Sequence, residues 1–200
     1  FHPAHGAAFL GSGFPGTVWC GCGVNAAGLA IGGSSCSANV PPPQEALAPH
    51  VVNRYALAHA ATVKEAVAVL ATIPVPRWGM NIALVDRSGA AAIVEKAGAV
   101  QGVRWSKGEP ILCTNFSCTI ELSAYRIENP TVLKESTDRF AAIERLIGGR
   151  PQSAALLGEI LAYNQQPGAI CRYGEEDPLK NETEFSSIFY PASGKAEFCF

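Results

Sequence analysis

Two apolar runs separated by a tight turn, Met80-Asn-Ile-Ala-Leu-Val-Asp86 and Ala90-Ala-Ala-Ile-Val-Glu95, decide the fold class of this chain. Both runs have the length and aliphatic content of β-strands. Arg87-Ser-Gly89 between them ends in the Ser-Gly pair that a short hairpin turn favours. The stretch therefore predicts an antiparallel pair of strands near the middle of the sequence.

Further strands are predicted on both sides of this hairpin. A β-prone run over 17–24 leads into a turn at Asn25-Ala-Ala-Gly28 and a return strand, Leu29-Ala-Ile31, which ends in the small residues Gly32-Gly-Ser-Ser-Cys36. The residues before it, 1–16, contain several Gly and Pro turn signals, so we expect a loop there. The remaining predicted strands are 100–105, a buried strand over 110–115, and a final hairpin of 186–190 with 195–200.

Helical spacing of apolar residues predicts four helices, over 51–58, 63–73, 136–147 and about 153–163. Thr62 and Glu65 form a capping box at the start of the second helix, and Ser136 or Thr137 is predicted to cap the third. Hairpins and helix pairs occur in blocks rather than in alternation. This order favours an α+β fold with mainly antiparallel sheets, built as a single domain over 1–200.

Composition narrows the class of protein. The chain has 200 residues, of which 48% are apolar and 16% are charged, against a typical charged share of about 25%, so it is not a disordered protein. Fifteen Lys and Arg against 17 Asp and Glu give 15 − 17 = −2, which leaves no basic field for nucleic acid. No apolar run approaches the roughly 18 residues of a membrane helix. Both observations argue against nucleic acid and membrane as partners.

The seven cysteines are an odd number and too sparse for a disulfide-stapled secreted domain, so we expect most of them to be buried thiols. Neither Cys20-Gly-Cys22 nor the pair Cys113 and Cys118 has the spacing of a zinc ribbon, and no structural zinc is expected. With no signal peptide visible, the odd count favours the cytoplasm. The first residue is Phe1 rather than Met, and we expect the chain to begin inside a longer gene product.

Common catalytic motifs are missing from the sequence, which has no Gly-x-Ser-x-Gly elbow, no P-loop and no His-Glu-x-x-His. Of four histidines, His2, His5 and His50 lie in or beside Pro-containing segments. The fourth, His59, lies late in a predicted helix, where a structural role is expected. A histidine-based triad is therefore not supported, and a hydrolase with this sequence needs another base.

Three polar segments remain as candidates for chemistry. They are Gly32–Cys36 after the first hairpin, Cys113-Thr-Asn115 at the end of an apolar run, and Ser136-Thr-Asp-Arg139 at a predicted helix start. Arg139 stands out because the helix dipole favours acidic rather than basic residues in a first turn. Each also has a structural interpretation, with Asn115 as a turn former, Arg139 as a solvated surface charge and the glycines as loop residues.

Taken together, these segments resemble a known family. Gly23-Val-Asn-Ala-Ala-Gly-Leu-Ala30 is similar to the Gly-x-Asn-x-x-Gly-Leu signature of the choloylglycine-hydrolase and penicillin-acyltransferase branches of the N-terminal-nucleophile (Ntn) hydrolases. Asn81-Ile-Ala-Leu-Val-Asp-x-x-Gly89 with Glu95 resembles the next hairpin of that family. Cys113-Thr-Asn115 resembles its strand ending in Thr-Asn, and Ser136-Thr-Asp-Arg-Phe140 its Ser-x-x-Arg-Phe. The order of the four agrees, and the acyltransferase-like branch fits better.

The resemblance implies a four-layer αββα sandwich of mainly antiparallel sheets, incomplete at the N-terminus, and chemistry at an amide carbonyl. In such enzymes an N-terminal Cys attacks the carbonyl and its own α-amino group is the base, so no histidine is needed. Carried over by position, Asn115 and Ser35 donate hydrogen bonds to the oxyanion, and Arg139 orients the surroundings of the nucleophile. Relatives usually have Asn where this chain has Ser35, and the shorter side chain leaves the backbone N–H as the donor.

Two functions stay open at this point. The first is an amide hydrolase or acyltransferase whose Cys lies on a segment upstream of Phe1, because Cys20 and Cys22 are internal and align with a core strand. The second is an inactive scaffold that acts as a small-molecule binding or interaction module, with exposed sheet edges that pair with another copy. Neither needs a metal or organic cofactor. The expected partners are a small amide or acyl substrate and either a second copy or the missing segment. Four aromatic residues line either an acyl pocket or the core: Trp19, Tyr55, Trp78 and Trp105.

Overall fold

The computed structural model describes residues 1–14, 16–36, 38–126, 129–177 and 179–200. The chain divides into two compact units, one of residues 1–127 with 189–195 and the other of residues 128–188 with 196–200. Each unit is described by itself.

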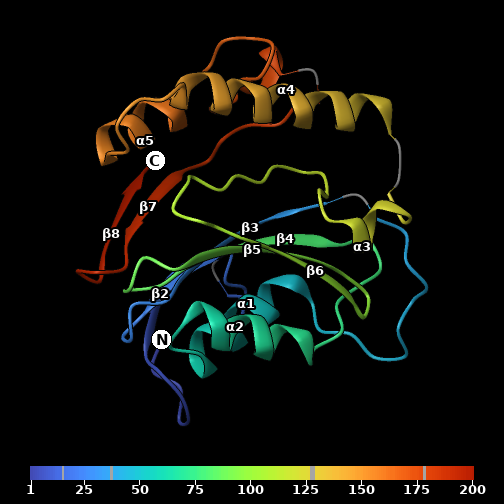
Figure 1. Ribbon diagram of the computed structural model, residues 1–200, viewed down its shortest axis with the longest axis vertical. Helices are drawn as coiled ribbons and strands as arrows, with labels where there is room; N and C mark the ends of the chain where they lie inside the picture. The colour runs from blue at the N-terminus through green and yellow to red at the C-terminus, as the bar shows by residue number, and fades with distance from the viewer. Residues whose placement is uncertain (15, 37, 127–128, 178) are drawn as a thin grey trace. The chain divides into compact units, whose positions relative to one another are not determined.

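The first unit contains a six-stranded sheet in which every strand pairs with its neighbour in sequence (Figure 1). All pairs are antiparallel, and the predicted central hairpin is confirmed, with Met80 opposite Lys96 and Val85 opposite Ala91. The strands are β1 (Phe9–Ser12), β2 (Cys22–Asn25), β3 (Ala30–Ser35), β4 (Met80–Val85), β5 (Ala91–Ala97) and β6 (Val100–Trp105). Short turns join β2 to β3, β4 to β5 and β5 to β6, as the hairpin pattern of the sequence indicates, whereas the connection from β3 to β4 contains two helices.

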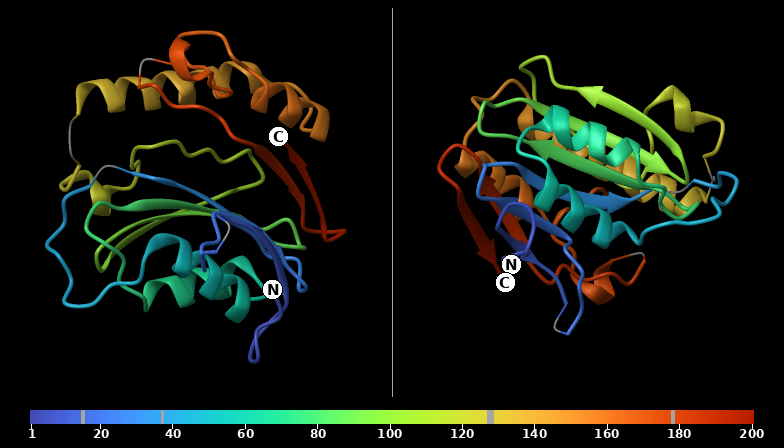
Figure 2. Two further views of the ribbon diagram at one scale, coloured as in Figure 1. Left: turned by 180° about the vertical axis from the view of Figure 1, so that it is seen from behind. Right: turned by 90° about the horizontal axis from the view of Figure 1, so that it is seen from below.

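Two helices, α1 (Pro49–His59) and α2 (Val63–Ala71), cover one face of this sheet (Figure 2). The predicted cap of α2 is confirmed, because the Thr62 hydroxyl accepts a hydrogen bond from the Glu65 N–H at 3.2 Å. The Glu65 carboxylate accepts from the Ala61 N–H at 2.7 Å, one residue earlier than in a standard capping box. Buried apolar residues of both helices pack against alternate residues of β3, β4 and β5, and this packing forms the main core.

The opposite face of the sheet is polar at several positions and is covered by residues 106–119 and the short helix α3 (Ile120–Ser123) (Figure 1). The prediction of a strand over 110–115 is wrong, because this segment forms no strand and lies on the face of the sheet instead. Its backbone is held by side chains of the sheet, so its apolar residues are sheltered without any strand pairing.

Strand β1 corrects a second prediction, since it lies within the segment expected to be a loop. Phe9 is buried and stacks on Phe1 with ring centroids 4.8 Å apart. Gly11 allows close packing, because a Cβ at this position would lie 2.6 Å from the Cys20 sulfur. The turn residues that surround this four-residue strand obscure its short apolar pattern in the sequence.

The second unit contains helices α4 (Pro130–Ile147) and α5 (Ala154–Leu161), the 3-10 turn η1 (Gly174–Glu176) and most residues of strands β7 (Ser186–Tyr190) and β8 (Lys195–Cys199). The predicted final hairpin is confirmed, and the helix predicted over about 153–163 is α5, which is capped by the Ser153 side chain. Helix α4 begins six residues before the predicted caps Ser136 and Thr137, which lie inside it. In the part of the chain that the structure describes, no helix is both long enough and apolar enough to cross a membrane.

The α4 start follows from Asn129 and Pro130. The Asn129 side chain accepts hydrogen bonds from Thr131 N–H at 3.2 Å and Val132 N–H at 3.3 Å, and Pro130 occupies the first helical position. Arg139 is therefore in the middle of a long helix, and the helix-dipole argument for its importance is wrong.

Lys96 is an exception in the apolar face of the sheet. It lies in β5 between Met80 of β4 and Gln101 of β6, and alternation places it on the side of the helices. Its side chain is fully buried, and among the described residues its amino nitrogen has no hydrogen-bond partner. Burial lowers the pKa of Lys96 to about 8. Holding this amine in the core therefore destabilises the folded state at neutral pH.

We expect Lys96→Met to raise the free energy of unfolding by about 1–3 kcal/mol at pH 7, because it removes this desolvation cost. The folded pKa lies below the unfolded value of about 10.4, so only the unfolded state binds the proton between about pH 8 and 10. Wild-type stability should rise with pH in that window, and the variant should show a flatter profile. Urea unfolding over pH 7–10, with the exposed Lys64→Met as control, measures both effects; a destabilised Lys96→Met would contradict the argument.

Candidate functional site

The segment that carries Asn115 is fixed to the sheet through the carbonyl of the residue before it. The Thr114 carbonyl accepts hydrogen bonds from Ser34 Oγ and from Asn81 Nδ2, both at 2.7 Å. Asn81 Nδ2 also donates to the Phe116 carbonyl at 2.9 Å, so one amide holds the backbone on both sides of Asn115. Ser34 belongs to β3 and Asn81 to β4, and both are on the face away from the helices.

The end of the same segment is held by Glu95 of β5, whose side chain is fully buried. Its carboxylate accepts hydrogen bonds from the backbone N–H groups of Cys118 at 2.7 Å and Thr119 at 2.8 Å. It also accepts from Arg104 Nε at 2.9 Å, and Arg104 in turn donates to the Leu112 carbonyl at 2.7 Å. A buried carboxylate with three donors is well satisfied, so this end of the segment is rigid.

These anchors place Asn115 against Ser35, two of the three predicted site residues. The Asn115 side-chain nitrogen donates to the Ser35 carbonyl at 2.8 Å and lies 3.3 Å from the Ser35 hydroxyl oxygen. The two residues are 80 positions apart in the sequence, and the structure brings them together.

The backbone of β3 turns toward an open edge at this point. Cys36 N–H donates to the Gly79 carbonyl, and alternate residues of an antiparallel strand bond to opposite sides. Ser35 therefore directs its N–H and C=O away from β4. On that side, the described pairing of β2 with β3 stops at Ile31. The Ser35 backbone N–H and the Asn115 side chain thus lie along the same edge of β3.

The third predicted residue, Arg139, belongs to the second unit and lies in a cluster of four charged side chains. Its NH1 is 3.8 Å from a Glu135 carboxylate oxygen, and the Arg139 side chain is only 11% exposed. The same oxygen accepts from Arg172 at 2.9 Å, and Arg172 also pairs with Asp177 at 2.7 Å. Arg139 is therefore not a solvated surface charge. Two cations and two anions neutralise one another in a largely buried site.

Asp177 is the fixed end of this cluster. Its carboxylate accepts hydrogen bonds from the backbone N–H groups of Leu179 at 2.9 Å and Asn181 at 3.0 Å. Burial by itself raises the pKa of Asp177, but these hydrogen bonds and the charge of Arg172 outweigh it and hold the pKa below its ordinary value. For Arg139, burial and the nearby Arg172 lower the pKa, while Glu135 and Asp177 act in the opposite direction.

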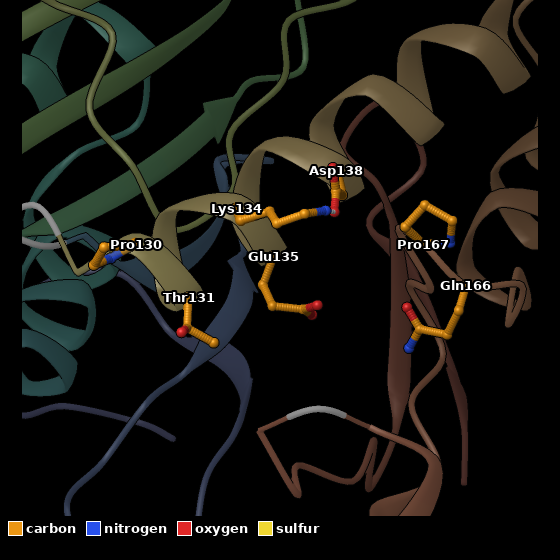
Figure 3. A pocket seen from close by; sticks show the side chains of 7 residues that line it. All are labelled: Pro130, Thr131, Lys134, Glu135, Asp138, Gln166 and Pro167. Carbon is orange, nitrogen blue, oxygen red and sulfur yellow. Dashed lines mark hydrogen bonds and ion pairs between the residues drawn. The ribbon is translucent and has the colours of Figure 1, made fainter.

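A cavity of about 590 Å³ lies beside this cluster on α4. Figure 3 shows the Lys134 side chain reaching toward Asp138, while Glu135 extends along a different direction. Lys134 and Asp138 form an exposed ion pair of 2.6 Å. The lining residues are Pro130, Thr131, Lys134, Glu135, Asp138, Gln166 and Pro167.

The expectation that most cysteines are buried is wrong, since Cys20 and Cys36 alone are fully buried among the seven. Burial raises the pKa of Cys20 and Cys113 to about 11 and that of Cys36 to about 12, so these thiols are poor nucleophiles at neutral pH. Within the described residues, no three His, Cys, Asp or Glu side chains gather in a way that could hold a metal ion.

The anchoring roles of Asn81, Glu95 and Ser34 were not predicted. Asn81 and Glu95 entered only as part of a family motif, and Ser34 only as part of the polar segment Gly32–Cys36. The available signal was a polar residue within an apolar strand, because such a residue must find a partner on the face where it is buried. Of the four aromatic residues considered for a pocket, Trp78 lines a described cavity, and all four are at least 39% exposed.

Residues 2–200 match the family described as acyl-coenzyme A:6-aminopenicillanic acid acyl-transferase. The chain belongs to this family. No match is found among curated protein sequences. The family match agrees with the four motifs, Gly23–Ala30, Asn81–Gly89, Cys113–Asn115 and Ser136–Phe140, that the sequence presents in order.

Among solved structures, penicillin V acylase from Agrobacterium tumefaciens matches with a TM-score of 0.63 and 21% identity, covering 90% of this chain and 62% of the acylase. This chain thus spans about 62% of that protein's length. Two variants of conjugated bile acid hydrolase from Clostridium perfringens match at TM-scores of 0.41 and 0.44, with 15% and 18% identity. They cover 72% and 87% of this chain, and 43% and 54% of the hydrolase chains.

The match to penicillin V acylase carries the fold assignment. Together with the family match it confirms the prediction of an Ntn-hydrolase-like α+β fold with antiparallel sheets.

Asn81→Asp tests the anchor of the candidate site. In the wild type, the Asn81 amide donates to the carbonyls of Thr114 and Phe116. The change keeps the shape of the side chain but replaces this donor with a carboxylate oxygen that faces both carbonyls. We expect the free energy of unfolding to fall by about 2–4 kcal/mol. Amide hydrogen exchange over residues 113–119 should also become faster. The exposed Asn164→Asp is the control, and unchanged exchange in 113–119 would show that the anchor does not hold this segment.

Asp177→Asn tests the charged cluster of the second unit. Its folded pKa is depressed, so the carboxylate stabilises the protein above its unfolded pKa of about 3.9, and this contribution is lost as pH falls through the folded pKa. The free energy of unfolding of the variant should be about 2–4 kcal/mol lower than that of the wild type at pH 7. The difference in free energy of unfolding between variant and wild type, measured by chemical denaturation, should become smaller as the pH falls from 5 to 2. Asp138→Asn, in an exposed pair, should change stability by less than about 1 kcal/mol.

Proposed function

We propose that this protein cleaves or transfers an acyl group at an amide carbonyl, with the attacking thiolate supplied by a cysteine outside the 200 residues. The observation that carries the proposal is the placement of the Asn115 amide nitrogen at the open edge of β3, beside the outward-directed N–H of Ser35. Two donors on one edge suit an oxyanion. Family membership and the raised pKa values of Cys20, Cys36 and Cys113 also support it.

In the proposed reaction, the sulfur of the external cysteine attacks the carbonyl carbon while its α-amino group accepts the thiol proton. An α-amino group has a pKa near 7.7–8.0, so it can act as this base at neutral pH. The C=O electron pair moves to the oxygen, which accepts hydrogen bonds from Asn115 Nδ2 and Ser35 N–H. The oxyanion then collapses, the C–N bond breaks, and the leaving nitrogen takes the proton. The acyl group is then bound to the cysteine sulfur as a thioester. Attack on this thioester by water completes hydrolysis, and attack by an amine completes acyl transfer.

In this scheme Asn115 Nδ2 exchanges one acceptor for another. Its contact with the Ser35 hydroxyl is 3.3 Å, longer than its 2.8 Å bond to the Ser35 carbonyl, and is the weaker of the two. A substrate oxygen would replace the hydroxyl as acceptor. We assign Arg139 of the second unit to orienting the nucleophile's surroundings, the role that the family resemblance implies for it. The ion pairs of Glu135, Arg172 and Asp177 would hold its guanidinium in place.

The test uses the full-length gene product, with its N-terminal residue determined by mass spectrometry, and a panel of chromogenic amides. Asn115→Ala should lower kcat about 100- to 1,000-fold with little change in KM, because it removes one oxyanion donor. Asn164→Ala, at an exposed position, should leave both constants unchanged. An unaltered kcat for Asn115→Ala would overturn the assigned role. Turnover by the 200-residue chain alone would overturn the external nucleophile.

A further inference from the structure

A cavity of about 640 Å³ lies within the second unit. It is lined by residues of α5, of the segment 171–185 and of the parts of β7 and β8 that belong to this unit. Its volume is within the range of about 300–1,000 Å³ that small-molecule sites occupy. None of its described lining residues belongs to the candidate site, to the charged cluster around Arg139 or to the cavity beside that cluster. It is therefore a separate feature of the chain.

Helix α5 turns toward this cavity the side that it does not bury. Gly158, Leu161 and Ala162 line the cavity and have the i, i+3 and i+4 spacing of one helix face. Leu156 and Ile160, the buried residues of α5, lie on the opposite side. Gly158 is in the middle of the helix, and a Cβ at this position would have no neighbour within 4 Å. The missing side chain at Gly158 therefore leaves space for a ligand.

The strands and the segment before them contribute aromatic rings to the cavity. The ring centroid of Phe185 lies 6.3 Å from that of Phe198 and 6.0 Å from that of Phe200. Tyr173 lines the cavity as well, and it is 52% exposed, while Phe200 is 95% exposed. Large aromatic side chains that gather at an open cavity favour a ligand with an apolar body, and their faces also attract cations.

The charged side chains that line the cavity are carboxylates, those of Glu184 and Glu197. Among the described lining residues none is Lys, Arg or His. Arg172 lies nearby in the sequence, but its guanidinium pairs with Glu135 and Asp177. Glu184 forms no hydrogen bond or ion pair with another described residue. An anionic ligand would be repelled here, whereas an ammonium group would meet two carboxylates and the faces of aromatic rings.

We propose that this cavity binds a hydrophobic amine, a ligand with an apolar or aromatic body and one ammonium group. The body packs against Leu161, Phe185 and Phe198, and the ammonium group lies near the carboxylates of Glu184 and Glu197. The inference goes beyond the proposed function, because it concerns noncovalent binding of a cation and requires neither the external cysteine nor the edge of β3.

The test compares three probes that share a phenethyl body, by NMR titration of the full chain at low ionic strength. Phenethylamine is a cation, phenethyl alcohol is neutral, and hydrocinnamate is an anion. We expect the amine to bind at least about tenfold more tightly than hydrocinnamate, with the alcohol between them, because the carboxylates attract the first and repel the last. Hydrocinnamate binding as tightly as the amine, or no binding of the amine, would overturn the proposal. Either result would leave the role of Asn115 untouched.

A variant that fills the cavity locates the site. Gly158→Leu projects a side chain into the open space beside α5, at a helical position where Leu is more favourable than Gly. We expect it to weaken phenethylamine binding at least about tenfold. Ala155→Leu is the matched control, because Ala155 is exposed on the same helix and is not among the described lining residues. Retained binding in a folded Gly158→Leu, or an equal loss in a folded Ala155→Leu, would overturn the assignment. Thermal unfolding checks the fold of both variants.

The double variant Glu184→Gln/Glu197→Gln tests the charge of the site. Both positions are exposed, so the fold should tolerate the change. We expect the ratio of amine affinity to hydrocinnamate affinity to fall at least about fivefold, while the alcohol binds as before. The control Glu45→Gln/Glu109→Gln removes the same net charge at exposed positions of the first unit and should leave the ratio unchanged. An equal ratio in the wild type and the Glu184→Gln/Glu197→Gln variant would overturn the role of the carboxylates.

Discussion

The candidate site depends on one carbonyl group, that of Thr114, which accepts hydrogen bonds from Ser34 and Asn81 of two adjacent strands. Residues 110–119 have no strand partner, so their buried backbone groups must be satisfied by side chains. With Glu95 holding the far end, the segment has little freedom to move away from the sheet. Asn115 reaches Ser35 because the residues on both sides of it are tied down.

The two faces of the same sheet therefore have different roles, one in the hydrophobic core and one in holding residues 110–119. Residues toward α1 and α2 are apolar and supply most of the buried area that stabilises the unit. At the alternate positions, Asn81 and Glu95 are polar and hold a backbone segment in place. Because the period of a strand is two, one run of sequence encodes both the core and the site. Lys96 is buried on the apolar face, where nothing described pairs with it.

The sequence was sufficient where pattern and local capping agree, as in the hairpin of β4 and β5, helix α2 with its Thr62 cap, and the final hairpin. It failed where a tertiary contact replaces the local signal. The run 110–115 is as apolar as a strand but is bound by side chains from elsewhere. The α4 start was missed because Asn129-Pro130 is as strong a cap as Ser136, and the sequence alone offered no way to rank them. Asn115 and Ser35 lay in two polar segments that the strand pattern singled out, and the family resemblance gave them their roles.

The Asn of the Gly-x-Asn-x-x-Gly-Leu motif has a structural explanation. Asn25, in the Gly-x-Asn-x-x-Gly-Leu signature, donates to the carbonyls of Leu57 and Ala60 at the end of α1 and accepts from the N–H groups of Ala27 and Leu29. These four hydrogen bonds hold the first hairpin against α1 and use both the donors and the acceptor oxygen of the Asn25 side chain, which therefore has a structural role. A match to this signature therefore identifies the scaffold. Any activity has to be argued from the edge of β3, where Asn115 lies beside the Ser35 backbone.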